Sequence, residues 1–366
     1  MSCDFIKLAV PGVAGLQPYQ PGKPIEELER ELGISDIIKL ASNENALGPS
    51  PRVIAALPEM ADLYRYPDGN GYVLKQALAE MHDVDTGQIT LGNGSNDILE
   101  FAARVFLRDG RSSVFSEHAF AIYPIVTQAV GARGIVTPAK NYGHDLTAML
   151  AAIGDDTRLV FIANPNNPTG TCLRTAELQA FLDQVPEHVI VLMDEAYFEY
   201  ARGGDYPECI QWLDRYRNLI VARTFSKAYG LAALRVGYAV SHPLLADLLN
   251  RVRQPFNVNS IALRSAVIAL QDQAHIEQAV RFNKAGMRQL IAGLDSMGIH
   301  FIPSSANFIC IDMEQDAQPI YEQLLRAGVI VRPVASYGMP DHLRVTIGLE
   351  QENDRFLSAL AGILSK

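Results

Sequence analysis

The chain of 366 residues contains 48% hydrophobic and 20% charged residues, a composition ordinary for a globular protein with a large core and two or three domains. Its formal net charge of −10 argues against general nucleic-acid binding, and an anionic ligand would need a local cluster of arginines or backbone N–H groups. Four cysteines without a C-x-x-C pair, histidines without ligand spacing, and the lack of a long apolar run predict a cytoplasmic protein without a metal site or membrane span.

The first 50 residues are rich in proline and glycine. They predict an extended arm around one short helix, residues 24–33, which ends at Gly33. An arm of this kind lies across the body of its own subunit or across a partner. We therefore assign residues 1–45 to an arm that packs on the small C-terminal domain or on a second subunit.

Helical spacing follows in residues 73–84 and 97–107, and short apolar runs then alternate with helical ones up to about residue 241. The runs at 158–165, 188–195 and 219–225 are apolar on both faces, as in strands that helices cover on both sides. Strand, helix and strand in repeated succession predict a mostly parallel sheet. The fold class is α/β, with a large domain over residues 46–255.

The pattern changes after Pro255. A long helical tract covers about 260–297, short strand-like runs follow near 307–313, 328–334 and 342–348, and an amphipathic helix ends the chain. This succession predicts a smaller α+β domain over residues 256–366.

Four segments at the ends of predicted strands carry candidate ligand-binding groups, since ligands gather at that edge of an open α/β sheet. The segment 92–97, GNGSND, places small residues at a helix start, where free N–H groups bind anions, although a merely capped helix has the same pattern. The segment 164–170, NPNNPTG, forms a stiff loop that could fix the amide of Asn167, or it is only structural.

The third segment, MDEAYFEY at 193–200, ends a buried strand with Asp194 and adds Tyr197 three residues later. A buried carboxylate needs a partner, and a protonated heterocyclic nitrogen is one; capping of the next helix is the alternative. The fourth, RTFSKAYGLAALRVGY at 223–238, places Lys227 where burial would lower its pKa and make it a nucleophilic amine, unless it is a surface lysine. Together the four segments supply the groups that pyridoxal phosphate requires.

The order and separation of N-N-P-T-G, D-E-A-Y, S-K and the arginine at 235 resemble the fold type I pyridoxal-phosphate-dependent aminotransferases, typified by aspartate aminotransferase. The resemblance implies that Lys227 binds the cofactor aldehyde and that Asp194 pairs with the pyridine nitrogen. It further implies that Tyr197 and Asn167 hydrogen-bond the ring hydroxyl oxygen. The remaining cofactor-binding residues that it implies are Ser95, Asn96, Thr224, Ser226 and Arg235 for the phosphate, and Phe120 for stacking on the ring.

Within that group the chain resembles the histidinol-phosphate aminotransferase family, through residues 16–24, 40–51, 64–71 and 331–348. The resemblance implies that Arg344 and its companion Arg332 bind the substrate phosphate as a two-arginine clamp. It places four further residues at the substrate, which are Tyr19, Asn45, Tyr123 and Phe256. It also implies a homodimer in which Tyr66 reaches the cofactor of the neighbouring subunit.

The chain departs from the family pattern at Ala46, where proline is common, and at Phe256, where tyrosine often occurs. Both positions bear on substrate preference. The reaction implied is transamination of L-histidinol phosphate with 2-oxoglutarate to imidazole-acetol phosphate and L-glutamate, which runs in reverse in histidine biosynthesis.

Several alternatives remain open from the sequence. An aromatic amino-acid aminotransferase or a decarboxylase of a phosphorylated amino acid would use the same lysine. A dinucleotide dehydrogenase is disfavoured because no complete G-x-G-x-x-G follows a strand, and the retained lysine disfavours a non-catalytic binding protein.

Overall fold

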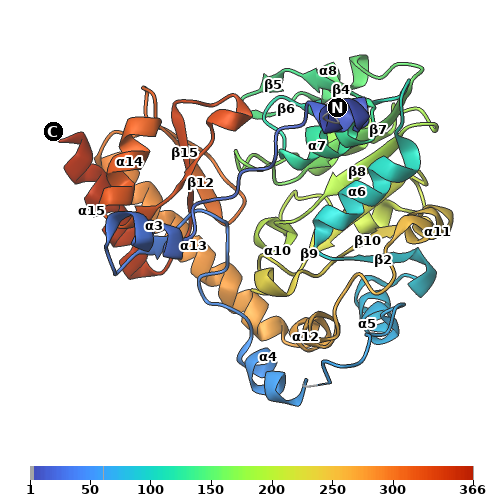
Figure 1. Cartoon of the computed structure of the whole chain (residues 1–366), viewed down its shortest axis with the longest axis horizontal. Coiled ribbons are helices and arrows are strands. Elements are labelled where there is room, and N and C mark those ends of the chain that lie inside the picture. The colour runs from blue at the N-terminus through green and yellow to red at the C-terminus, as the bar shows by residue number, and fades with distance from the viewer. Residues whose placement is uncertain (1–3, 61, 366) are drawn as a thin grey trace.

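The computed structural model describes residues 4–60 and 62–365 and contains two main sheets, one of seven strands and one of four (Figure 1). In spatial order the larger sheet consists of β2 (Ile89–Gly92), β10 (Gly237–Ser241), β9 (Leu219–Thr224), β8 (Ile190–Asp194), β7 (Thr157–Ala163), β3 (Ser112–Ser116) and β4 (Arg133–Thr137). Only β10 runs antiparallel to its neighbours, which confirms the predicted α/β class with a mostly parallel sheet.

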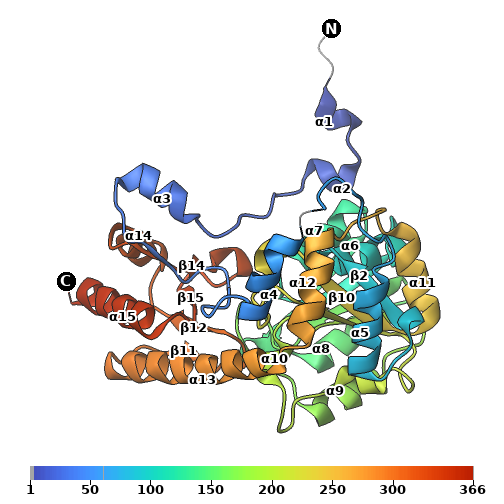
Figure 2. The same cartoon turned by 90° about the horizontal axis from the view of Figure 1, so that it is seen from below.

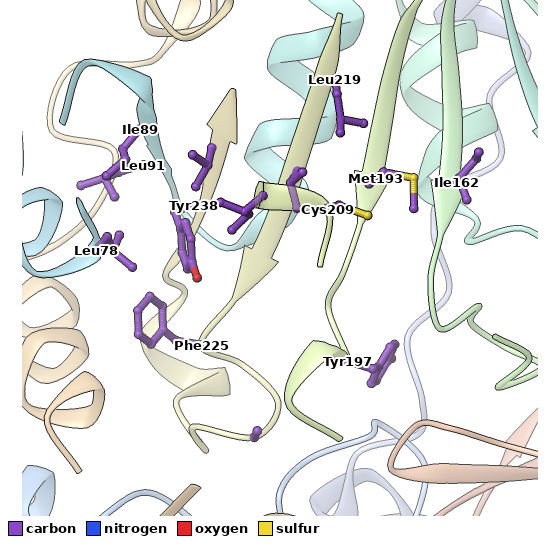
Figure 3. Packing of buried hydrophobic residues seen from close by; sticks show 14 of the residues in the cluster. Leu78, Ile89, Leu91, Ile162, Met193, Tyr197, Cys209, Leu219, Phe225 and Tyr238 are labelled. Carbon is purple, nitrogen blue, oxygen red and sulfur yellow. The ribbon is translucent and has the colours of Figure 1, made fainter. Parts of the chain in front are cut away.

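Helices bury both faces of this sheet, which explains why its central strands are apolar throughout. Along β7, Val160 and Ile162 point into one cluster of buried side chains, whereas Leu159 and Phe161 point into the other. The first cluster includes side chains of α5 (Tyr72–His82), α8 (Leu146–Ala151), α9 (Thr175–Leu182) and α12 (Ser260–Leu270). Figure 3 shows part of it, with Tyr197 just beyond the end of β8. The second cluster includes side chains of α6 (Ser95–Phe106), α7 (Ile122–Ala129) and α11 (Pro243–Val252).

The smaller sheet is antiparallel, in the order β11 (Phe301–Ile302), β12 (Phe308–Asp312), β15 (His342–Thr346) and β14 (Arg332–Pro333). Side chains of α13 (Gln273–Ser296), α14 (Gln318–Arg326) and α15 (Glu350–Leu364) form a separate buried cluster with it. Further short elements are α4 (Pro51–Ala56), α10 (Phe198–Ala201), β5 (Ala139–Lys140), β6 (Gly143–His144), and the 3₁₀ turns at 57–59, 86–88, 209–212, 232–234 and 335–337.

The N-terminal segment spans the two parts of the molecule. Helix α1 (Phe5–Leu8) projects from the body, and α2 (Pro11–Ala14) packs on α7 of the large part (Figure 2). Helix α3 (Ile25–Leu32) and β1 (Ile38–Lys39) lie on the small part, where β1 pairs in parallel with β13 (Val329–Ile330). The chain then returns to the large part at α4.

The domain boundary expected at residue 255 stays a prediction, and the packing argues for a later one. Helix α12 contacts α4 and α5 and joins the buried cluster of the large sheet. Helix α13 then leads into the small part (Figure 2). We infer that the small part begins between α12 and α13.

Strands β7, β8 and β9 are parallel, so their carboxyl ends share one edge of the sheet, which carries Asp194 and the segment that leads to Lys227. Within residues 4–60 and 62–365, no helix is long and apolar enough to cross a membrane, and no group of three His, Cys, Asp or Glu side chains could hold a metal ion.

Candidate active site

A pocket lies at the carboxyl edge of the large sheet, between the two parts of the molecule. It receives side chains from the ends of β8 and β9, from the start of α6, from β14 and β15, and from the N-terminal segment. The predicted site residues that line it are Tyr19, Ser95, Asn96, Phe120, Asn167, Asp194, Tyr197, Thr224, Ser226, Lys227, Arg235, Arg332 and Arg344. Four motifs that are far apart in the sequence therefore converge on one space.

Asp194 is buried in this pocket, and Lys227 is partly buried beside it. Lys227 Nζ donates to the backbone oxygen of Ser42 at 3.2 Å, and burial, with Arg344 nearby, lowers the pKa of this amine to about 8. Asp194 Oδ1 accepts from the Ala196 N–H at 3.2 Å, and burial raises the pKa of its carboxyl to about 6 despite this bond. The site thus combines an amine that is partly unprotonated near neutral pH with a carboxylate whose charged form a cationic or N–H partner would stabilise.

One end of the pocket is built to hold an anion. Arg235 Nη1 donates to Ser226 Oγ at 3.3 Å, and the Thr224 hydroxyl accepts from the Ser226 N–H at 3.1 Å. Helix α6 begins beside them. Its N-cap residue, Gly94, has no side chain that could accept from the first backbone N–H groups, so these groups are available to an anion. A Cβ at Gly94 would lie 2.5 Å from Arg235 Nη2, and its φ of +82° also favours glycine. The close approach of loop and arginine explains the glycine.

A second cationic region lies on the small sheet. Arg332 and Arg344 are direct cross-strand partners on β14 and β15, and both side chains are buried. Arg344 donates to Asn167 Oδ1 and, at 2.8 Å, to the backbone oxygen of Ala41, while Arg332 donates to the backbone oxygen of Gln20. The buried Nε of Arg344 has no hydrogen-bond partner among the described residues. Two guanidinium groups with an unused donor favour binding of a second anion here, in addition to the anion at the Arg235 end.

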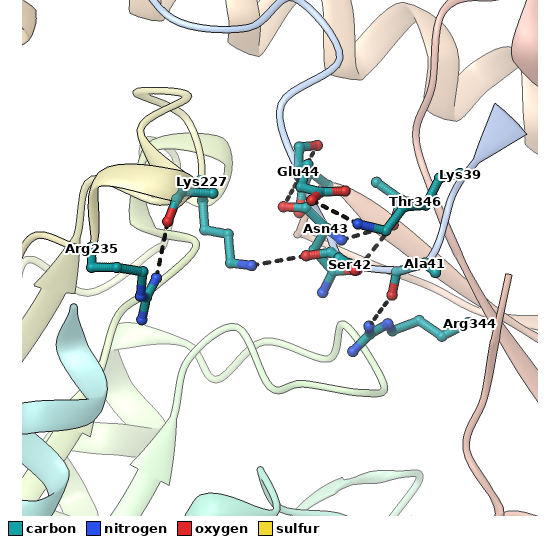
Figure 4. Close-up of polar contacts among 11 residues, drawn as sticks. Lys39, Ala41, Ser42, Asn43, Glu44, Lys227, Arg235, Arg344 and Thr346 are labelled. Atoms are coloured by element: carbon teal, nitrogen blue, oxygen red, sulfur yellow. Dashed lines mark hydrogen bonds and ion pairs between the residues drawn. The ribbon is translucent and has the colours of Figure 1, made fainter. Parts of the chain in front are cut away.

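A segment that sequence reasoning did not place in the site runs through its centre. We call residues 41–43 the strap, and each of them contacts one site residue. Ala41 O accepts from Arg344, and Ser42 O accepts from Lys227 (Figure 4). The Asn43 amide donates to Tyr197 Oη at 2.8 Å. The motif LASNENALGPSP contains the strap, but nothing in it tells which residue points inward.

Three of the predicted substrate residues, Asn45, Tyr123 and Phe256, do not line the pocket. Tyr123 is fully buried behind Asp194, where its hydroxyl donates to Asp194 Oδ2 at 3.0 Å and its ring stacks on Phe161 with centroids 4.7 Å apart. The Asn45 amide donates instead to the backbone oxygens of Ala228 and Gly48 and so fixes a turn. Tyr123 therefore packs in the interior, whereas the partly buried Asn45 uses its amide to stabilise the backbone rather than to face the pocket.

Tyr66 and Phe256 also lie outside the pocket, and they lie together. Their rings stack with centroids 4.7 Å apart at 22°, and Tyr66 is 83% exposed. Phe256 adopts a φ of +57°, in the left-handed region. Neither residue lines the pocket of its own subunit. The roles of Phe256 at the substrate and of Tyr66 at the cofactor therefore stay predictions, and a contribution of Tyr66 would have to come from a second subunit.

The donor set suits a flat, phosphorylated heterocycle. Cationic and N–H donors stand at the Arg235 end, whereas Lys227, Asp194, Asn167 and Tyr197 surround the remaining space. Because Arg344 occupies Asn167 Oδ1, the amide nitrogen of Asn167 is left to donate. The residues present therefore fit pyridoxal phosphate, with an amine for its aldehyde, a carboxylate for its ring nitrogen and donors for its oxygens.

The model of class I and II aminotransferases matches residues 35–360 of the chain. The chain is 62% identical to histidinol-phosphate aminotransferase 2 of Pseudomonas fluorescens over the whole of both chains, and 60% identical to the enzyme of that name from Pseudomonas aeruginosa over 99% of each. The solved structure of histidinol-phosphate aminotransferase from Sinorhizobium meliloti, in complex with pyridoxal phosphate, superposes with a TM-score of 0.91 at 29% identity and covers 97% of each chain. The chain belongs to the class I and II aminotransferases and, among them, to the histidinol-phosphate aminotransferase family.

Proposed function

We propose that this aminotransferase uses pyridoxal phosphate to exchange an amino group between L-histidinol phosphate and 2-oxoglutarate, with imidazole-acetol phosphate and L-glutamate as the products. In histidine biosynthesis the reaction runs toward histidinol phosphate. The family membership and the donor set of the pocket both support this assignment.

The observation that carries the proposal is the presence of two separate cationic regions in one pocket. Arg235 with Ser226 and the start of α6 suits the cofactor phosphate. Arg332 and Arg344 then remain for a substrate anion, and the unpaired Nε of Arg344 is a donor that such an anion would satisfy. A phosphorylated substrate uses both guanidinium groups more fully than a singly charged carboxylate does.

Lys227 supplies the base. Its Nζ would hold the cofactor through the aldehyde carbon. Once released, the same amine would act as the base that takes the proton from the substrate Cα. The lowered pKa of the amine leaves a useful unprotonated fraction at neutral pH. When bound, pyridoxal phosphate supplies the electron-withdrawing ring that makes the Cα proton acidic.

The neighbouring groups orient and polarise. The Asp194 carboxylate would accept a hydrogen bond from the ring nitrogen and keep that nitrogen protonated. Asn167 Nδ2 and the Tyr197 hydroxyl would donate to the ring oxygen, and Phe120 would pack against the ring face. Tyr19 covers the Arg332 side, where the guanidinium carbon lies 5.9 Å from the Tyr19 ring centroid.

The active unit we propose is a homodimer in which Tyr66 completes the cofactor site of the partner. Apolar side chains gather around Tyr66 at high exposure, namely Leu63, Tyr64, Tyr72 and Val73, each at least 60% exposed. An exposed apolar patch of this kind is typical of a subunit interface. Mixing inactive Lys227→Ala subunits with inactive Tyr66→Ala subunits should restore one working site per mixed dimer, and the absence of any recovered activity would contradict the shared site.

A steady-state assay separates the proposal from its rivals. We expect turnover of histidinol phosphate with 2-oxoglutarate to exceed turnover of phenylalanine. A preference for phenylalanine would favour an aromatic aminotransferase, and release of CO₂ without 2-oxoglutarate would favour a decarboxylase. We also propose that the enzyme acts in the cytoplasm, since Cys172, Cys209 and Cys310 are all unpaired thiols.

A further inference from the structure

We propose that Asn43 is a positioning residue, which aims the phenolic proton of Tyr197 into the pocket and so at the ring oxygen of the cofactor. This proposal rests on the proposed function, because it concerns the same site. It assigns a task to the strap, which the sequence motifs did not place in the site.

Asn43 is fully buried and hydrogen-bonded on every side. Its backbone N–H donates to Thr346 Oγ1 at 2.9 Å, its carbonyl accepts from Asn307 Nδ2 at 3.0 Å, and its side-chain Nδ2 donates to Tyr197 Oη at 2.8 Å. Thr346 lies on β15, two residues beyond Arg344, and Asn307 immediately precedes β12. The amide therefore ties Tyr197 of the large part to the small sheet.

The orientation of the Asn43 amide follows from the proton count at Thr346. The Thr346 hydroxyl already accepts from the Asn43 backbone N–H, and its own proton goes to Asn43 Oδ1 at 3.1 Å. Reversing the amide would leave that buried proton without an acceptor among the described residues, which is costly. The oxygen of the amide consequently faces Thr346, and its nitrogen faces Tyr197.

Tyr197 thus receives a hydrogen bond and keeps its own proton for another acceptor. A phenol has a single proton, and Asn43 is the only partner of Tyr197 Oη among the described residues. The ionisable groups that face the phenol are Arg344 from β15, Asp194 at the end of β8, Tyr337 of the 335–337 turn, and Lys227, whose Nζ lies 5.6 Å from the ring centroid. Burial raises the pKa of the Tyr197 phenol, so it stays protonated and remains a donor.

The choice of asparagine also fits the backbone. Asn43 has a φ of +56°, a conformation that asparagine, aspartate and glycine tolerate better than other residues. Asn43→Gly therefore removes the amide without adding backbone strain, and Asn43→Asp keeps the shape but replaces the donor with an acceptor that competes for the phenolic proton.

The test measures the apparent pKa of the cofactor absorbance band after reconstitution with pyridoxal phosphate. Donation from Tyr197 to the ring oxygen stabilises negative charge there and lowers the proton affinity of the adjoining nitrogen on Lys227. Loss of one hydrogen bond of ordinary strength should raise the apparent pKa by about 0.5–1 unit. We expect this rise in both Asn43 variants, and a smaller change or none when either substitution is made in a Tyr197→Phe background.

Asn307→Ala is the matched control, because it removes the hydrogen bonds to the backbone oxygens of Asn43 and Glu44 without touching the Tyr197 hydroxyl. If the Asn43 substitutions shift the band equally in the wild-type and Tyr197→Phe backgrounds, or if Asn307→Ala reproduces the shift, Asn43 is only a structural support and the proposal is wrong. Failure of the proposed function would look different. The wild-type protein would then form no band with pyridoxal phosphate, or would form the band without turning over histidinol phosphate.

Discussion

The Tyr123 hydroxyl donates a hydrogen bond to Asp194 Oδ2 at 3.0 Å from behind the pocket, whereas the Ala196 N–H holds Oδ1. Both carboxylate oxygens are therefore fixed before a cofactor arrives. The two contacts come from different elements, since Tyr123 lies on α7 and Ala196 follows β8. Asp194 owes its direction, and part of its remaining acidity, to a residue that never faces the ligand.

Replacement of Tyr123 by phenylalanine should weaken cofactor binding about three- to tenfold, because one hydrogen bond to a buried carboxylate disappears while the ring stacked on Phe161 remains. Equilibrium titration of the protein with pyridoxal phosphate measures the change. Tyr206→Phe is a matched control, since that buried hydroxyl donates to the backbone oxygen of Asn164. Equal losses in the two variants would show that Tyr123 has no particular effect on Asp194.

Replacement of Asp194 by asparagine should stabilise the cofactor-free protein at high pH. The folded-state pKa of about 6 lies above the ordinary 3.8, so the wild-type carboxyl makes a contribution to stability that is present below pH 4 and is lost as the pH rises to 6. The loss is about 3 kcal/mol for two pKa units. Melting temperatures of both proteins between pH 4 and 8 should diverge above pH 4, with the variant higher.

The same Asp194→Asn variant should bind pyridoxal phosphate about 10- to 100-fold more weakly, because a charge-assisted hydrogen bond becomes a neutral one. In the melting experiment, if the temperatures of wild type and variant changed with pH in parallel, the raised pKa of Asp194 would be ruled out. Unchanged cofactor affinity would argue that Asp194 does not meet the ring nitrogen.

The rate at which Lys227 reacts with the cofactor aldehyde should depend on pH as expected for an amine of pKa about 8. Only the unprotonated amine attacks an aldehyde, so the rate constant of reconstitution should rise nearly tenfold per pH unit below pH 8 and level off above it. Stopped-flow absorbance records this rate, with an Nα-blocked lysine of ordinary pKa as the comparison. A rate that keeps rising to pH 10 would contradict the lowered pKa, and Lys227→Ala should leave no borohydride-reducible link.

Replacement of Arg332 by glutamine should lower kcat/KM for histidinol phosphate more than for phenylalanine, by about tenfold in the ratio, because a phosphate gains more from a second guanidinium than a carboxylate does. Arg217→Gln provides the control, since this arginine contacts His242 on the surface away from the pocket. An unchanged ratio would mean that Arg332 only supports the Gln20 carbonyl.

The sequence allowed prediction of the groups that stand at strand ends, and Lys227, Asp194, Tyr197 and Asn167 all line the pocket as expected. A strand that is apolar on both faces is typical of a parallel sheet, and the last residues of parallel strands all lie at the same edge. The strap escaped prediction because its contacts with Lys227 span 185 residues and depend on how the small part packs against the large one. The left-handed backbone at Asn43 also breaks the alternation by which an extended segment could be assigned an inner face.

Tyr123 shows a different limit. It stands three residues after Phe120 on the same stretch, and their rings meet edge to face with centroids 5.9 Å apart, yet only Phe120 reaches the pocket. Only three positions separate the ring that faces the ligand from the ring that is fully buried, and the sequence pattern does not distinguish the two aromatic residues.

Arg344 serves the substrate region and the cofactor region at once, since it orients Asn167 and holds the Ala41 carbonyl of the strap. A change of specificity made at Arg344 would therefore disturb the amide that meets the cofactor, and the catalyst would be damaged along with the selectivity. Arg332 has no such link to Asn167. Substitutions at Arg332 and Tyr19 can therefore change the preference among anionic substrates during evolution or engineering. Arg344 has to be kept, because Asn167 depends on it.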